Sequence, residues 1–198
     1  MIGKRTLDVF VSLIGIIFFL PLFIILALLI KIEDPKGPVF FKQVRIGKNG
    51  KEFYMYKFRS MVSNAEELLE TLLDKNEVTG LMFKMKNDPR VTKVGRVIRK
   101  TSIDELPQLL NVLKGEMSLV GPRPPLPREV KDYTTYHMKR LEVTPGCTGL
   151  WQVSGRNSVG FEEMVELDLQ YIRRRNLFLD IKIIMKTVWI LLRPNSAY

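Results

Sequence analysis

Two adjacent carboxylates, Asp104 and Glu105, lie in a basic stretch of the chain and are the residues best suited to chemistry. The basic side chains on either side of the pair are Arg96, Arg99, Lys100, Lys114, Arg123 and Arg128. Carboxylates among cations indicate chemistry on an anion, and phosphate is the anion that the planar guanidinium of arginine fits well. One carboxylate can act as a nucleophile while its neighbour orients it, because successive residues of a helix point in different directions.

The same two residues are candidate metal ligands. Two carboxylates beside phosphate groups suit Mg²⁺, a hard cation that prefers oxygen ligands. An acidic pair at a helix start can also do no more than complement the helix dipole, as we expect for Glu66 and Glu67. The basic neighbourhood is what favours chemistry at Asp104 and Glu105.

Three arginines are candidate phosphate ligands: Arg99, Arg123 and Arg156. Arg123 lies between Pro122 and Pro124, which restrict the backbone and would aim its side chain. Arg156 follows a stretch rich in turn residues. We therefore expect the three guanidinium groups to converge near the carboxylate pair.

Pro107 predicts that the carboxylate pair opens a helix. Proline is tolerated in the first helical turn, where its missing N–H would have no partner, so the helix is expected to begin near Ile103 to Glu105. Ser102 and Glu105 also have the spacing of a capping box. At a helix start the dipole stabilises negative charge, and free N–H groups can bind an anion.

The N-terminal region is expected to enter a membrane. Residues Val9 to Ile30 carry no charge and would form a helix about 33 Å long, enough for the bilayer core. Pro21 predicts a kink near the middle. Basic residues precede and follow the segment, and both flanks favour the cytoplasmic side. We expect a re-entrant hairpin over residues 1–32, broken at Pro21; a simple spanning helix is the alternative.

The remaining residues, 33–198, are expected to form one small catalytic domain. The predicted strands are Val39 to Val44 and Phe53 to Phe58, joined by a turn that contains Gly47, Asn49 and Gly50. The predicted helices are Ser63 to Lys75, Val91 to Arg99, Phe161 to Arg175 and Leu177 to Leu192. The expected fold class is α/β, mostly helical with a short β-hairpin.

The C-terminal helix, residues 177–193, has the pattern of an interfacial amphipathic helix. Lys182, Lys186 and Arg193 fall within about 40° on a helical wheel, and most other positions are apolar. A buried core helix with a basic edge would show a similar pattern and is the alternative.

Net charge indicates the class of binding partner, and the cysteine count excludes a disulfide within the chain. The net charge of +10 favours an anionic partner, and the apolar N-terminus indicates membrane lipid rather than nucleic acid. Cys147 is the only cysteine, so no disulfide can form within the chain.

A series of short motifs, in order along the chain, resembles the bacterial sugar transferases, the monotopic phosphoglycosyl transferases. The motifs are Lys4-Arg5-x-x-Asp8, the apolar segment with Pro21, Phe41-x-Gln43-x-Arg45-x-Gly47, Tyr56 to Met61, Asp104 to Leu109, Asn111 to Gly115, Gly121 to Pro124, Pro145-Gly146-x-Thr148-Gly149, Gly155-Arg156-Asn157, and Glu166-Leu167-Asp168 with Tyr171. Two positions depart from the family pattern: Leu20 replaces the usual serine before Pro21, and Cys147 replaces an aliphatic residue.

The resemblance implies the reaction. A sugar 1-phosphate would pass from a UDP-sugar to undecaprenyl phosphate through an aspartyl-phosphosugar on Asp104, with release of UMP. Glu105 would help to hold Mg²⁺ and position Asp104. Lys57 and Arg59 would join Arg99, Arg123 and Arg156 in neutralising phosphates.

The resemblance also implies the setting: the cytoplasmic face of the bacterial inner membrane, at the first membrane step of exopolysaccharide or related glycoconjugate synthesis. It identifies neither the sugar nor the oligomeric state, and a homo-oligomer remains open. Two alternatives stand beside it. One is a non-enzymatic basic module that recruits partners to the membrane. The other is a transferase in which the polyprenyl phosphate attacks the UDP-sugar directly.

Overall fold

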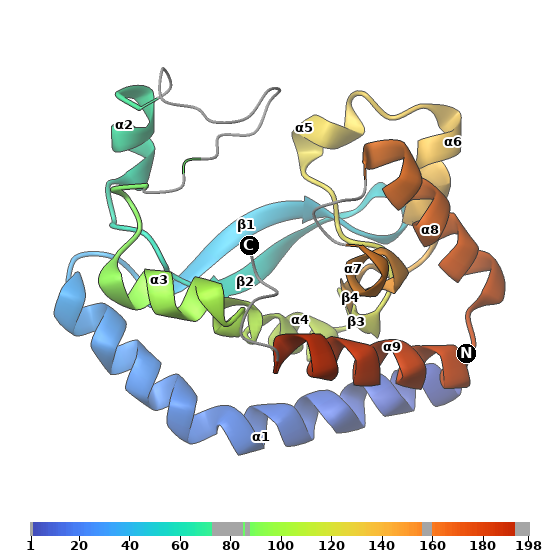
Figure 1. The fold of residues 1–198 in the computed structure, drawn as a ribbon, viewed down its shortest axis with the longest axis horizontal. Helices are drawn as coiled ribbons and strands as arrows, with labels where there is room; N and C mark the ends of the chain where they lie inside the picture. The colour runs from blue at the N-terminus through green and yellow to red at the C-terminus, as the bar shows by residue number, and fades with distance from the viewer. Residues whose placement is uncertain (1, 73–84, 86–87, 156–159, 193–198) are drawn as a thin grey trace.

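The computed structural model consists of one long N-terminal helix beneath a mostly helical domain that contains a β-hairpin (Figure 1). It describes residues 2–72, 85, 88–155 and 160–192. The long helix, α1, spans Ile2–Glu33. This arrangement confirms the expected fold class.

Helix α1 is continuous and contains Pro21 in its interior. Figure 1 shows α1 bending near the middle of its length. Proline removes one hydrogen bond of the helix ladder and clashes with the preceding turn, so a bend is the expected result. The predicted interruption is therefore present as a bend within one helix.

Both ends of α1 are bound to the same domain. Near its start, Lys4 Nζ donates to Asp180 Oδ2 at 2.9 Å. At its end, the Glu33 carboxylate accepts backbone N–H groups of Lys93 and Val94, at 2.6 and 3.0 Å. Large apolar side chains between the two ends are exposed: Phe10, Leu13, Ile14, Ile17, Phe18, Leu20, Ile24, Ile25, Leu28, Leu29 and Ile32. Of the described helices, α1 alone is long and apolar enough to cross a membrane.

The β-hairpin forms as predicted. Strands β1 (Phe40–Ile46) and β2 (Glu52–Phe58) pair in antiparallel fashion, each slightly longer than expected. A single 3₁₀ turn, η1 (Lys48–Gly50), joins them. Asn49 and Gly50 both have positive φ, which asparagine and glycine tolerate better than other residues.

Among the other helices, the long ones were predicted from their apolar periodicity, and most of the short ones were not. These other helices are α2 (Ala65–Glu70), α3 (Lys93–Lys100), η3 (Ile103–Glu105), α4 (Gln108–Lys114), α5 (Pro127–Val130), α6 (Thr135–Met138), η4 (Lys139–Glu142), α7 (Leu150–Ser154), α8 (Phe161–Arg174) and α9 (Leu177–Leu191). The last two lie within one residue of the predicted bounds. The helix predicted from Ser63 to Lys75 is observed as the shorter α2. Its expected last residues lie outside the described part of the chain. Arg193, predicted to be on the basic side of the C-terminal helix, also lies outside it.

A short parallel pair of strands was not predicted. Strand β3 (Ser118–Val120) pairs with β4 (Gly146–Thr148). A Cβ atom on Gly146 would lie 2.0 Å from the backbone nitrogen of Gly121, so glycine is required where the two segments pass. Three residues are too few for alternation to reveal a strand.

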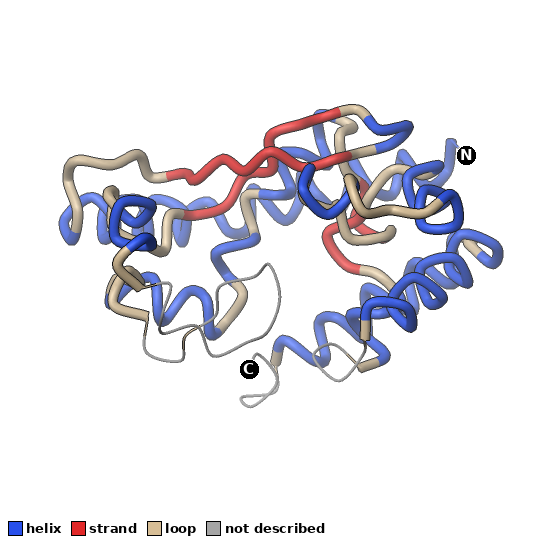
Figure 2. Tube along the Cα trace, turned by 90° about the horizontal axis from the view of Figure 1, so that it is seen from above, coloured by secondary structure: helices blue, strands red, loops and turns tan. Residues whose placement is uncertain are grey.

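Two hydrophobic clusters hold the elements together. One joins the hairpin, α4, β3, α8 and α9 through Phe53, Met55, Val112, Met117, Leu119, Val120, Tyr171 and Ile183. The other joins the second half of α1 to the hairpin and α3 through Leu26, Ile30, Phe58 and Ile98. Figure 2 shows α9 starting close to the N-terminal end of the chain and diverging from α1 along its length.

Candidate active site

Asp104 and Glu105 lie in η3, a single 3₁₀ turn that precedes α4. The Leu106 N–H donates to the Ile103 carbonyl at 3.1 Å, and Pro107 has no N–H to continue the ladder. Helix α4 therefore begins only at Gln108, with Pro107 as its N-cap. The position of the pair was predicted correctly, but its first turn is 3₁₀ rather than α-helical.

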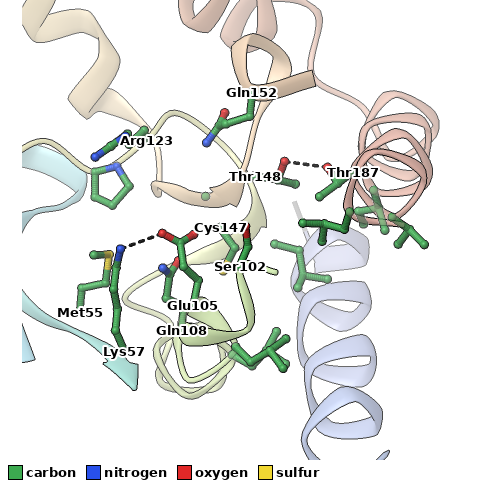
Figure 3. Close-up of a pocket in the computed structure, with 18 of the residues that line it drawn as sticks. Met55, Lys57, Ser102, Glu105, Gln108, Arg123, Cys147, Thr148, Gln152 and Thr187 are labelled. Carbon is green, nitrogen blue, oxygen red and sulfur yellow. Dashed lines mark hydrogen bonds and ion pairs between the residues drawn. The ribbon is translucent and has the colours of Figure 1, made fainter. Parts of the chain in front are cut away.

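The predicted capping box between Ser102 and Glu105 is wrong. Ser102 has a φ of 56° and its side chain makes no capping hydrogen bond. The Glu105 carboxylate instead binds Lys57, with Nζ and Oε1 2.7 Å apart (Figure 3). A charged partner on strand β2 thus replaces the local backbone partner that the spacing indicated.

The two carboxylates have different environments. Asp104 is only 9% exposed, and its burial raises its pKa to about 6 against the opposing charge of Lys57. The Glu105 side chain is 46% exposed. Desolvation acts to raise the pKa of Glu105, but the charges of Lys57, Arg123 and Arg45 outweigh it and hold that pKa below its ordinary value. At neutral pH both groups are ionised. The charge of Asp104 is less well solvated, because that side chain is buried.

Asn111 fixes α4 against the hairpin. It is fully buried; its Nδ2 donates to the Tyr54 carbonyl at 2.7 Å, and its Oδ1 accepts the Tyr56 N–H at 3.0 Å. This clamp holds β2 in register with α4, and the next residue of the strand is Lys57. The sequence placed Asn111 in a motif, but nothing local to it indicated this role.

A pocket of about 440 Å³ is lined by Glu105, and the buried Asp104 lies directly behind it in the chain without lining the pocket itself. Figure 3 shows Lys57 and Glu105 on one side of it, Arg123 above them, and Thr148 and Thr187 on the far side. Arg45 and Gln108 also line the pocket, and the charges of Lys57, Arg123 and Arg45 all act on Glu105. Three cations thus surround Glu105, so this part of the pocket is suited to an anion.

Two of the predicted phosphate ligands reach this neighbourhood in different ways. Arg123 lines the pocket directly. Arg99, in the last turn of α3, acts on Asp104 through its charge, which lowers the carboxyl pKa. It is not among the described residues that line the pocket.

Arg59 is placed elsewhere. Its guanidinium is buried against the end of α1, where Nη1 lies 3.2 Å from Asp34 Oδ2 and Nη2 lies 3.4 Å from the Ile30 carbonyl. These contacts anchor α1 to the hairpin, and Arg59 is not among the described residues that line the pocket. Arg156 lies outside the described residues. Pro21 lies in the interior of α1, where it was expected to break the membrane segment.

Arg45 is a pocket residue that sequence reasoning did not single out. It is 4% exposed, and its two terminal nitrogens donate to the Pro124 carbonyl at 3.0 Å and to Gln43 Oε1 at 2.7 Å. Its Nε has no hydrogen-bond partner among the described residues. Burial and the charge of Arg123 lower its pKa to about 10. Arg45 follows the predicted strand directly, so its position next to that strand was the available signal. A buried guanidinium of this kind favours an anionic ligand.

Comparison with known proteins agrees with this chemistry. Residues 1–194 match the family model described as bacterial sugar transferase. The chain is 49% identical to the galactosyl transferase CpsE of Streptococcus agalactiae, over 100% of the chain and 44% of that protein. It is 47% identical to the undecaprenyl-phosphate galactose phosphotransferase of Salmonella typhimurium, over 98% of the chain and 41% of that protein.

A third relative is closer in length. The exopolysaccharide production protein ExoY of Rhizobium meliloti is 44% identical over 99% of the chain and 88% of that protein. The chain thus spans less than half of the first two relatives and most of the third.

Proposed function

Because the chain belongs to the bacterial sugar transferase family, we propose that it transfers a sugar 1-phosphate from a UDP-sugar to undecaprenyl phosphate. The observation that carries the proposal is the buried carboxylate of Asp104 beside the Glu105–Lys57 pair, next to a pocket with three cations. The products would be UMP and a polyprenyl-diphospho-sugar, the starting unit of an exopolysaccharide or related glycoconjugate. The names of the relatives support both the acceptor and the pathway.

The proposed reaction has two steps. The Asp104 carboxylate attacks the β-phosphorus of the UDP-sugar, the bond to the bridging oxygen breaks, and UMP leaves with the electron pair. A phosphate oxygen of the polyprenyl phosphate then attacks the aspartyl-phosphosugar and releases Asp104. Desolvation of Asp104 supports its role as nucleophile, because a poorly solvated carboxylate is more reactive.

Arg45, Lys57 and Arg123 would neutralise the diphosphate and stabilise the charge that develops on UMP as it leaves. Glu105 keeps its negative charge because these cations hold its pKa down. Its ion pair with Lys57 would orient both groups. Arg99 would favour the ionised form of Asp104 from the side of α3.

Mg²⁺ fits this donor set. Asp104 and Glu105 supply two carboxylates, and Mg²⁺ commonly binds one or two carboxylates together with water and substrate phosphates. Among the described residues, no group of three or more acidic, histidine or cysteine side chains is placed to hold a metal ion. The remaining ligands would therefore come from the diphosphate and water, and the metal would offset phosphate charge when bound.

The proposed setting is the cytoplasmic face of the bacterial inner membrane, with α1 entering and leaving by that face. Two observations support this placement: both ends of α1 are bound to one domain, and both flanks are basic. The exposed apolar residues between the ends would contact lipid. A lipid-linked acceptor and a water-soluble nucleotide sugar can then meet at the interface.

The test is UMP release from a panel of UDP-sugars by the full chain, with and without undecaprenyl phosphate. We expect one equivalent of UMP and a labelled protein adduct without acceptor, and neither with Asp104→Asn. Turnover only with acceptor present would favour direct attack instead. A lack of UMP from the whole panel, with membrane binding retained, would favour the non-enzymatic module. Full activity of Asp104→Asn would exclude Asp104 as the nucleophile.

A further inference from the structure

The pocket beside the acid pair has two chemically different ends. Much of the remaining lining is apolar: α9 contributes Ile184, Val188 and Leu191, and other elements contribute Leu109, Leu119 and Trp151. A UDP-sugar has no hydrocarbon chain, and the polar edges of its uracil and sugar rings find no hydrogen-bond partners on the aliphatic side chains of this lining. The cationic end accounts for a phosphate, but the apolar end requires another part of a ligand.

The wall from α9 is one regular face of that helix. Ile184, Thr187, Val188 and Leu191 follow the i, i+3, i+4, i+7 spacing of residues that share a side. Val188 and Leu191 are 47% and 44% exposed although they line the pocket, so the pocket is open at this end.

Thr187, the one polar residue of these four, already has partners. Its Oγ1 lies 2.7 Å from Thr148 Oγ1, as Figure 3 shows, and lies 2.9 Å from the Ile183 carbonyl, to which it donates. The Thr187 hydroxyl is therefore already hydrogen-bonded within the protein. A ligand against this face therefore meets methyl and methylene groups.

A neighbouring face of α9, roughly a quarter turn from the first, is also apolar. This outer stripe is formed by Phe178, Met185, Trp189 and Leu192, which are all exposed. A helix at the surface of a water-soluble domain has one apolar stripe, which packs inward, so a second and exposed stripe suits lipid. Near its start, α9 is joined to α1 through the Lys4–Asp180 pair. The open end of the pocket thus adjoins the surface expected to contact the membrane.

We propose that the inner face of α9, formed by Ile184, Thr187, Val188 and Leu191, binds the first isoprene units of the lipid acceptor while its phosphate occupies the cationic end. This inference rests on the proposed function and adds the place of the acceptor. An amphiphile with an anionic head and a hydrocarbon chain matches both ends of the pocket. The rest of its chain can remain in the bilayer, past Val188 and Leu191.

The first test is photocrosslinking with a diazirine-bearing isoprenyl phosphate in vesicles that contain the full chain. We expect the label on residues 184–191 at inner-face positions, and we expect undecaprenyl phosphate to compete it away. Label confined to the outer stripe or to α1 would overturn the inference. This readout needs no turnover: specific label at the inner face with no UMP from any UDP-sugar would refute the transferase and leave the lipid site intact.

The second test compares two tryptophan variants. Val188→Trp would fill the open end of the pocket, whereas Met185→Trp places the same side chain on the outer stripe. We expect Val188→Trp to raise the KM for undecaprenyl phosphate at least tenfold and to change the KM for the UDP-sugar much less. Met185→Trp should leave both unchanged. Equal KM values for undecaprenyl phosphate in the two variants would contradict the inference. If Val188→Trp does not fold, the crosslinking experiment alone tests whether the lipid chain lies on the inner face of α9.

Discussion

At the scale of single residues, Asp104 and Glu105 are adjacent in the chain but differ in solvation. Burial disfavours the charge of Asp104, and nearby cations favour the charge of Glu105. A carboxylate held ionised in a poorly solvating site is a reactive nucleophile, and a solvated one paired with Lys57 suits positioning and phosphate chemistry. The proposed division of roles therefore rests on environment, because the two side chains carry the same functional group.

The pH dependence of UMP release should report the ionisation of Asp104. Activity is expected to fall about tenfold per pH unit below about 6, because a protonated carboxyl cannot attack. The charge of Lys57 lowers the pKa of Asp104, so Lys57→Met should move this acid limb to higher pH. Lys51→Met, at an exposed turn position, is the control and should not move it. A limb that stays in place in Lys57→Met would contradict the assignment.

Asp104→Asn should be inactive yet more stable. The folded-state pKa of about 6 lies above the ordinary 3.8, so the associated stability is present below pH 3.8 and is lost as pH rises through 6. This shift corresponds to about 3 kcal/mol at neutral pH. Asparagine removes the buried charge, and the melting temperature at pH 7.5 should rise relative to wild type.

Glu105→Gln provides the matched comparison for that stability gain. The pKa of Glu105 is lowered, so folding favours its charge, and that contribution is present above its ordinary pKa and lost as pH falls. This variant should therefore gain no stability at pH 7.5. A melting temperature that rises equally in both variants would show that burial of Asp104 is not the cause.

At the scale of elements, the site depends on how α4 is held against β2. The carboxylate pair precedes α4, and Lys57 lies on β2, 48 positions earlier in the chain. Asn111 joins the two elements through backbone groups of Tyr54 and Tyr56. One buried amide thus sets the register that brings Lys57 to Glu105.

Asn111→Ala should cost about 2–4 kcal/mol of unfolding free energy, because it leaves an N–H and a carbonyl of β2 buried without partners. Thermal unfolding in detergent measures the loss, and UMP release should fall with it. Asn64→Ala, at an exposed position before α2, is the control and should cost less than about 1 kcal/mol. Similar losses in the two variants would show that Asn111 is not a clamp.

At the scale of the whole molecule, α1 is a long apolar helix whose two ends are tied to the same domain. Lys4 binds Asp180 at one end, and Glu33 caps α3 at the other. A helix that crossed the bilayer would place these two sets of contacts on opposite sides. The bend in α1 lets both form while the apolar middle faces outward (Figure 1).

Cysteine labelling tests this topology. In a Cys147→Ala background, Gly3→Cys and Lys51→Cys place single thiols at exposed positions near the start of α1 and in the hairpin turn. A membrane-impermeant maleimide should label neither thiol in intact cells and both after permeabilisation. Labelling of only one thiol from outside would show that α1 spans the membrane.

Local patterns were enough to predict many features of this chain. The hairpin, α8 and α9 follow from residue periodicity and turn residues, the long apolar helix from 22 uncharged residues, and the start of the acid-bearing turn from Pro107. Adjacent carboxylates among cations indicated phosphate chemistry. Each of these signals is contained within a few turns of chain, which is the range over which periodicity and proline act.

Contacts between distant segments settled the rest. Packing decided that Asp104 is buried and Glu105 exposed, that Arg45 enters the pocket, and that Arg59 instead anchors α1. It also gave α9 an apolar wall toward the pocket as well as an exposed apolar stripe. Burial and ion pairing depend on which segments meet across the fold, and no window of the sequence around a single residue contains that information.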